Sequence, residues 1–159
     1  MGYGESEDFS RALDAAYRLL AYKQRSRKEL ISRLQRKGFP EEIIEEVARK
    51  LETKKYLDDE AYGHTLARSL IQRKFLGRGA VRAELLKKGL DIEVVKKITE
   101  ESYIELDEGD LAIQALEKKW KTLKGRPLEV AKRRASDYLR RKGFSLSVIR
   151  KVLVDKFEG

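Results

Sequence analysis

The sequence predicts an all-α protein made of three tandem three-helix repeats that form an elongated, curved array. Three observations lead to this fold class. A motif centred on a glycine recurs three times, about fifty residues apart, as in repeat proteins. Apolar residues recur with the period of a helix, and no segment shows the sustained alternation typical of a strand. The prolines, Pro40 and Pro127, both stand next to expected helix starts.

The repeated motif becomes clear when Gly38, Gly89 and Gly143 are superposed. In each copy two basic residues precede the glycine, a leucine stands four positions before it, and a phenylalanine or leucine follows it. Apolar residues stand five, six and nine positions after each glycine: Ile43, Ile44 and Val47; Val94, Val95 and Ile98; Val148, Ile149 and Val152. Agreement at so many positions indicates one structural unit present three times.

Each expected helix has local start and stop signals. The basic residues before each glycine complement the C-terminal dipole of a helix, and the glycine provides a left-handed cap. Ser26 and Glu29 form a capping box. Pro40, Asp91 and Ser145 start the helices that follow the glycines. The expected helices are 12–23, 27–37 and 40–54 in the first unit, 58–74, 79–88 and 91–104 in the second, and 109–122, 127–142 and 145–157 in the third.

The predicted domain organisation is a short tail followed by the three repeats. Residues 1–11 are expected to be a disordered N-terminal tail. The repeats are expected at 12–57, 58–108 and 109–159, the last of them basic. The joints near residues 55–57 and 105–109 are short and are not rich in glycine and serine, so we expect a semi-rigid array.

Charge is abundant and unevenly distributed. Of the 159 residues, 40% are charged, and the formal net charge is +9. Residues 1–57 carry a net charge of +3, residues 58–109 a net charge of −2, and residues 110–159 a net charge of +8. Such a basic chain attracts polyanions, either nucleic acid or an anionic membrane, and the uneven distribution favours a binding surface over a uniformly solvated one.

Several classes of protein are excluded by composition. No apolar stretch reaches the roughly 18 residues of a membrane span, and no signal peptide is recognisable, so we expect a soluble, cytoplasmic protein that does not bind membranes. The absence of cysteine removes disulfides, zinc–thiolate sites and cysteine nucleophiles together. No heptad run indicates an obligate oligomer, so a monomer is expected.

No group of residues forms a catalytic pattern, so we expect no catalytic residue, cofactor or metal. His64 is the only histidine, which excludes any site built on two histidines. The acidic run at residues 58–60 could bind a hard cation but is better explained as helix capping. The Gly-Arg-Gly segment 77–79 lacks the lysine and the strand of a phosphate loop. Trp120 lies on a core stripe with Leu116 and Leu123 and is not expected to stack on bases.

Five segments together resemble the RecX family, the regulatory proteins of the RecA recombinase, over roughly residues 12–157. They are Ser-Arg-Lys-Glu-Leu at 26–30, Tyr-Leu-Asp-Asp-Glu-Ala-Tyr at 56–62, Arg68 with Arg73, Glu-Leu-Leu-Lys-Lys-Gly-Leu at 84–90, and Tyr-Leu-Arg-Arg-Lys-Gly-Phe at 138–144. The chain departs from the family pattern at Tyr62-Gly63, where Phe-Ala is usual, and in the segment 74–79.

The resemblance implies a function that composition alone does not give. RecX-like proteins lodge in the groove of the RecA filament on single-stranded DNA and limit filament growth, and with it ATP hydrolysis, strand exchange and co-protease activity. The expected partners are therefore the RecA filament and single-stranded DNA. An inhibitor is favoured, although an activator would use the same binding surface.

The residues expected to contact RecA or DNA are basic. The resemblance supports Arg68 and Arg73, and the others follow from electrostatics. The full set is Arg25, Arg27, Lys28, Lys37, Arg68, Arg73, Lys74, Arg78, Arg82, Lys132, Arg133, Arg140 and Arg141.

Other functions remain open at this point. A sequence-independent nucleic-acid-binding helical module without a recombinase partner would also carry a basic face. The net charge of −2 on the second unit argues against phosphate binding there and suits a mixed target of protein and DNA. A pure scaffold would bind without regard to salt or DNA. An enzyme is the least favoured alternative, because no acid, base or nucleophile pair is present.

Overall fold

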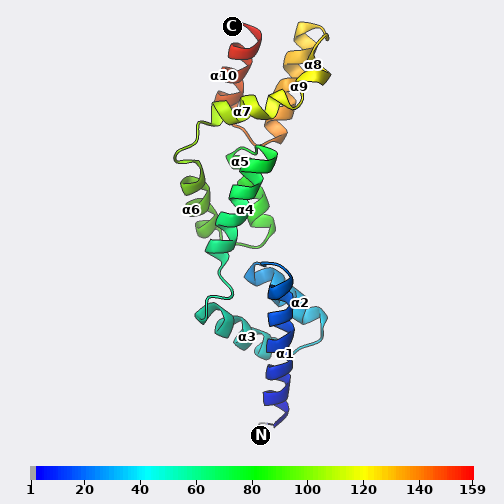
Figure 1. The fold of residues 1–159 in the computed structure, drawn as a ribbon, viewed down its shortest axis with the longest axis vertical. Coiled ribbons are helices and arrows are strands. Elements are labelled where there is room, and N and C mark those ends of the chain that lie inside the picture. The colour runs from blue at the N-terminus through cyan, green and yellow to red at the C-terminus, as the bar shows by residue number, and fades with distance from the viewer. Residues whose placement is uncertain (1–2) are drawn as a thin grey trace.

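The computed structural model describes residues 3–159 and confirms the all-α fold. Within this range the chain forms ten helices and no strand. Figure 1 shows three helical groups that follow one another along the long axis, with the two ends of the chain at opposite ends of the molecule. The repeats therefore form an elongated array, in which a large surface is available for binding.

The first repeat consists of α1 (Tyr3–Tyr22), α2 (Arg27–Arg36) and α3 (Glu41–Thr53). The prediction of a disordered tail over residues 1–11 is wrong from Tyr3 onward, because α1 begins there; Met1 and Gly2 lie outside the described residues. Phe9 helps to explain the longer helix. It packs against the core of the repeat, and the ammonium group of Lys50 lies 5.4 Å from the centre of its ring.

The second repeat consists of α4 (Asp59–Lys74), α5 (Arg78–Lys87) and α6 (Ile92–Tyr103). The Asp58 side chain caps α4 by accepting a hydrogen bond of 3.1 Å from the backbone N–H of Ala61. At the other end of α4, Phe75 takes a left-handed conformation, with φ of 53°. The hydroxyl group of Tyr103 donates a hydrogen bond of 2.6 Å to the carbonyl of Leu76 and so fixes the loop that follows.

The third repeat differs from the prediction in its first helix. The expected helix 109–122 is divided by a turn at residues 118–119, so the repeat consists of α7 (Glu108–Glu117), α8 (Trp120–Leu123), α9 (Leu128–Arg141) and α10 (Leu146–Phe157). The backbone N–H of Lys119 bonds to the carbonyl of Leu116 at 2.9 Å, which tightens the turn. Trp120 then packs on the core, as predicted, and lies 5.6 Å from the ring of Phe157.

The second and third repeats share one hydrophobic core, whereas the first repeat has its own. Backbone contacts join the second and third repeats: the N–H of Gly77 donates to the carbonyl of Lys142 at 2.8 Å, and that of Gly79 to the carbonyl of Gly143 at 3.1 Å. The glycines of segment 77–79 therefore allow a close approach of two backbones.

The first and second repeats meet through polar contacts at the start of α2. The backbone N–H of Arg27 donates a hydrogen bond of 2.8 Å to Asp59, and the stem of Lys28 lies against Gly89. Among the described residues, no helix has both the length and the apolar character that a membrane crossing needs.

Candidate nucleic-acid interface

A strongly basic hollow lies where the first repeat meets the second. We call it the junction hollow; it has a volume of about 320 Å³, and seven of the nine residues that line it are basic. They come from the end of α1, from α2 and from the end of α5. The lining residues are Lys23, Arg25, Lys28, Glu29, Ser32, Arg33, Arg36, Lys87 and Lys88.

Ser26 holds the two sides of the junction hollow together. Its hydroxyl group donates a hydrogen bond of 2.6 Å to the carbonyl of Lys88 and accepts one of 3.2 Å from the backbone N–H of Glu29. The carboxylate of Glu29 lies 3.3 Å from the ammonium of Lys88. Arg33, Arg36 and the other exposed cations of the hollow thus project from a fixed frame, so their charges concentrate at one place on the surface.

A second basic hollow lies between α8 and α9, and we call it the C-terminal hollow. It has a volume of about 290 Å³ and is lined by Lys119, Thr122, Leu123, Arg134, Asp137, Tyr138 and Arg141. The ammonium groups of Lys119 and Lys142 each lie 5.5 Å from the centre of the Tyr138 ring. Burial, together with the positive charges of Lys74 and Lys119, lowers the pKa of Lys142 from its ordinary value. Positive charge is therefore crowded here.

Four of the predicted contact residues are engaged within the protein. The guanidinium of Arg27 pairs with Glu45 and Glu52, and these hydrogen bonds hold its pKa above the ordinary value despite partial burial. Arg78 pairs with Glu108 at 2.8 Å and lies 5.3 Å from the ring centre of Tyr103. The two others are Lys132, which pairs with Glu158 at 3.1 Å, and Arg25, which is only 5% exposed and donates to the carbonyl of Leu19 at 3.2 Å.

The remaining predicted residues are exposed but do not form one surface. Lys28 lines the junction hollow and Arg141 the C-terminal hollow. Arg68 and Arg82 line two other hollows, each of which also contains a glutamate. The others are exposed at the ends of helices or along α9: Lys37, Arg73, Lys74, Arg133 and Arg140.

The structure also adds basic residues that sequence reasoning did not select. They are Lys23, Arg33, Arg36, Lys87 and Lys88 in the junction hollow, and Lys119 and Arg134 in the C-terminal hollow. Lys87 and Lys88 were visible in the sequence as the basic pair before Gly89. That pair was interpreted as complementing a helix dipole and as part of the resemblance at 84–90, and nothing in the local pattern shows that it faces α2.

These features define a class of protein: a helical-repeat binding protein whose basic hollows suit anionic partners. Comparison with known families identifies the particular one. Models of the first, second and third three-helix domains of RecX match residues 12–51, 58–97 and 107–153. The chain belongs to the RecX family.

Individual relatives agree with this assignment. The chain is 33% identical to the regulatory protein RecX of Chlorobium limicola over 153 residues, which cover 95% of this chain and 94% of the relative. It is 35% identical to the regulatory protein RecX of Chlorobaculum tepidum over 144 residues, which cover 91% and 87% of the two chains. The crystal structure of RecX from Lactobacillus salivarius has the same fold, with a TM-score of 0.85 at 22% identity over 96% of this chain and 98% of that one.

The family assignment confirms two expectations from the sequence. The resemblance was correct, and the three repeats correspond to three family domains. The protein is a regulator and not an enzyme, which agrees with the missing acid, base and nucleophile pairs.

Proposed function

We propose that this protein regulates the RecA recombinase by binding in the groove of the RecA filament on single-stranded DNA. It acts there as an inhibitor that limits filament extension, and therefore ATP hydrolysis, strand exchange and co-protease activity. The observation that carries the proposal is the junction hollow, where seven basic side chains from two repeats of a RecX-family protein converge.

The two basic hollows lie in different parts of the array. The junction hollow is lined by residues of the first and second repeats, and the C-terminal hollow by residues of the third repeat. A helix rises about 1.5 Å per residue, so α4 alone is about 24 Å long. Three repeats in line (Figure 1) extend further than this one helix, so we expect the array to reach more than one subunit of a filament.

The charges of the repeats assign different contacts to different parts of the target. The basic hollows suit DNA phosphates or acidic protein surfaces, because both are anionic. The second repeat has a net charge of −2 even with Lys87 and Lys88, which line the junction hollow, so the rest of its surface suits protein instead. This mixture of charges favours protein-coated DNA as the target. The alternative, a sequence-independent nucleic-acid-binding module, would bind naked nucleic acid.

The test is the single-stranded-DNA-dependent ATP hydrolysis of RecA, with this protein titrated below the stoichiometry of RecA at two salt concentrations. Inhibition is expected well below one molecule per RecA subunit, and it weakens at the higher salt concentration. No change in rate, even at concentrations that saturate free DNA, contradicts the proposal and leaves the nucleic-acid-binding module. A faster rate contradicts the inhibitory part and keeps the filament as the partner.

A further inference from the structure

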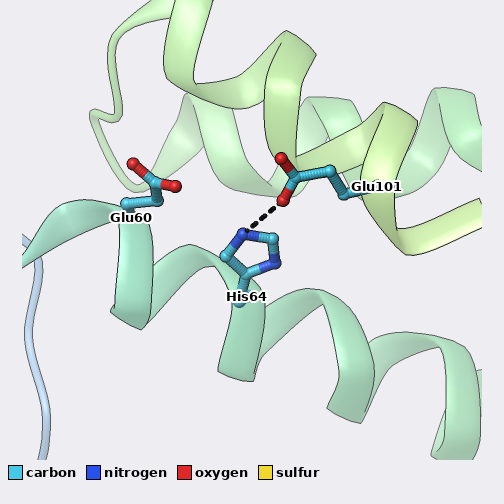
Figure 2. Close-up of side chains that lie close together, drawn as sticks. All are labelled: Glu60, His64 and Glu101. Carbon is cyan, nitrogen blue, oxygen red and sulfur yellow. Dashed lines mark ion pairs between the residues drawn. The ribbon is translucent and has the colours of Figure 1, made fainter.

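Three potential metal ligands meet on the surface of the second repeat. Glu60 and His64 stand four residues apart on α4 and so share a face of that helix, while Glu101 comes from α6. One ligand atom of each residue lies within 4.8 Å of those of the other two. Figure 2 shows the ring of His64 directed toward Glu101, with 3.0 Å between Nε2 and the nearest carboxylate oxygen.

This donor set has a clear chemical preference. One imidazole nitrogen with two carboxylate oxygens suits Zn²⁺ and other first-row divalent ions, whereas Ca²⁺ and Mg²⁺ favour oxygen ligands alone. Zn²⁺ binds such donors at about 2.1 Å, so tetrahedral geometry places them roughly 3.4 Å apart. Rotation of the exposed glutamate side chains can bring the donors this close, and water can take the fourth position.

We propose that Glu60, His64 and Glu101 bind a divalent transition-metal ion, with Zn²⁺ as the preferred ion, and that this ion ties α4 to α6. No metal was expected from the sequence, because His64 has no second histidine as a partner and only residues 58–60 were considered as oxygen ligands. Within that run, Asp58 caps α4 and Asp59 accepts a hydrogen bond from Arg27, so Glu60 alone takes part in the cluster.

Lys97 competes with the metal for Glu60. Its ammonium lies 2.8 Å from the carboxylate of Glu60, and its side chain is 55% exposed. An exposed ion pair contributes little to stability, so a metal ion can displace it. The ammonium then moves into solvent, and its positive charge near the metal lowers the affinity without removing the site. Replacing Lys97 should therefore strengthen metal binding, whereas replacing a ligand should weaken it.

The first experiment is a titration of Zn²⁺ into the untagged, metal-free full chain, measured by calorimetry and by NMR. The chain has one histidine, so the imidazole signals belong to His64 without further assignment. We expect one saturable site per chain and a shift of these signals that saturates at the same zinc concentration. Absence of saturable binding, or saturation that leaves the imidazole signals unmoved, overturns the proposal.

Paired variants distinguish the site from general attraction of cations to carboxylates. Glu101→Gln is expected to weaken Zn²⁺ binding by at least about tenfold. Even residues that only support a metal ligand cost about this much when they are replaced, so a ligand should cost no less. Glu100→Gln, an equal charge change at the neighbouring exposed position, leaves binding within twofold. Lys97→Met strengthens binding, whereas Lys96→Met does not. Equal effects within either pair contradict the proposal, and circular dichroism verifies that each variant is folded.

Discussion

The hydroxyl group of Ser26 donates a hydrogen bond of 2.6 Å to the carbonyl of Lys88, sixty-two residues away in the sequence. The same hydroxyl accepts a hydrogen bond from the backbone N–H of Glu29 at the start of α2. Ser26 is completely buried. One side chain therefore both starts a helix of the first repeat and fixes the end of a helix of the second, which sets the shape of the junction hollow.

Replacing this serine tests both of its contacts. Ser26→Ala is expected to lower the free energy of unfolding by about 2–3 kcal/mol, because it removes a helix cap and leaves a carbonyl without its partner. Ser145→Ala is the control, since Ser145 caps α10 through the N–H of Val148. That change is expected to cost about 1 kcal/mol. Urea denaturation measures both losses in the free energy of unfolding. Equal losses contradict the conclusion that Ser26 holds the two repeats together.

Two glycines of the repeated motif have the same backbone conformation but different surroundings. Gly38 and Gly143 have φ of 88° and 91°. A Cβ atom at Gly38 meets nothing within 4 Å, whereas one at Gly143 lies 2.2 Å from the backbone nitrogen of Ala80. Gly38→Ala is expected to cost about 1–2 kcal/mol from the left-handed conformation. Gly143→Ala is expected to lower the free energy of unfolding by about 1–3 kcal/mol more, because the backbones at Gly143 and Ala80 must separate.

Thermal denaturation of both variants measures this difference. A larger loss for Gly143→Ala supports the close contact between α5 and the end of α9. Indistinguishable melting temperatures show instead that the third repeat can shift without loss, which contradicts the shared core of the second and third repeats.

Stability at high pH depends on a buried tyrosine. Burial, assisted by the negative charge of Glu29, raises the pKa of Tyr62 from 10.0 to about 12. The native state therefore holds this proton more tightly than the unfolded chain does. The contribution of protonated Tyr62 to the free energy of unfolding is complete below pH 10 and is lost as the pH rises toward about 12. Tyr62→Phe should reduce this fall, whereas Tyr22→Phe, at a side chain that is 83% exposed, should not.

Urea denaturation at pH 9 and at pH 11.5 measures this effect. Tyr103 has a raised pKa for the same reason, burial, so Tyr62→Phe removes only part of the loss. A loss of stability that is unchanged in Tyr62→Phe contradicts the assignment to this side chain.

The junction hollow should determine how salt affects binding to single-stranded DNA. Each phosphate contact contributes about 0.7 to the slope of the logarithm of affinity against the logarithm of salt concentration. Replacing both Arg33 and Arg36 by glutamine should make the slope shallower by about 1.4. The control replaces Arg49 on α3 and Lys54, the residue after α3, by glutamine. Both are exposed outside the two hollows, and the change removes the same charge. Fluorescence anisotropy at several salt concentrations gives the slopes, and equal slopes for the two variants contradict a role for the hollow.

The helices were largely predictable because their signals are local. Ser26 and Asp91 cap the helices that their sequence positions predict, and Gly38, Gly89 and Gly143 all have positive φ. The turn that divides α7 from α8 was missed, since no glycine or proline marks residues 118–119. Trp120, the residue after this turn, packs against Phe157, which is far away in the chain, and local sequence signals do not show such a contact.

The candidate site was only partly predictable, because charge in a sequence does not reveal its partner. Arg27 and Arg78 were selected as contact residues, yet they pair with glutamates 18 to 30 residues away. Conversely, Arg33 and Lys87 face one hollow only because two repeats meet there. Ion pairs between helices depend on the tertiary structure. A count of basic residues therefore finds the charged regions but does not show which side chains in them are available to a partner.

Whether the RecA filament is the partner is tested by comparing the affinity of this protein for RecA-coated and for uncoated single-stranded DNA of equal length. Both are measured by fluorescence anisotropy at the same, physiological salt concentration, with a non-hydrolysable nucleotide holding the filament. We expect binding at least about tenfold tighter to the filament, a coupling in the usual range for two sites acting together. Equal affinity for the two, or tighter binding to uncoated DNA, contradicts it and makes the protein a general nucleic-acid binder.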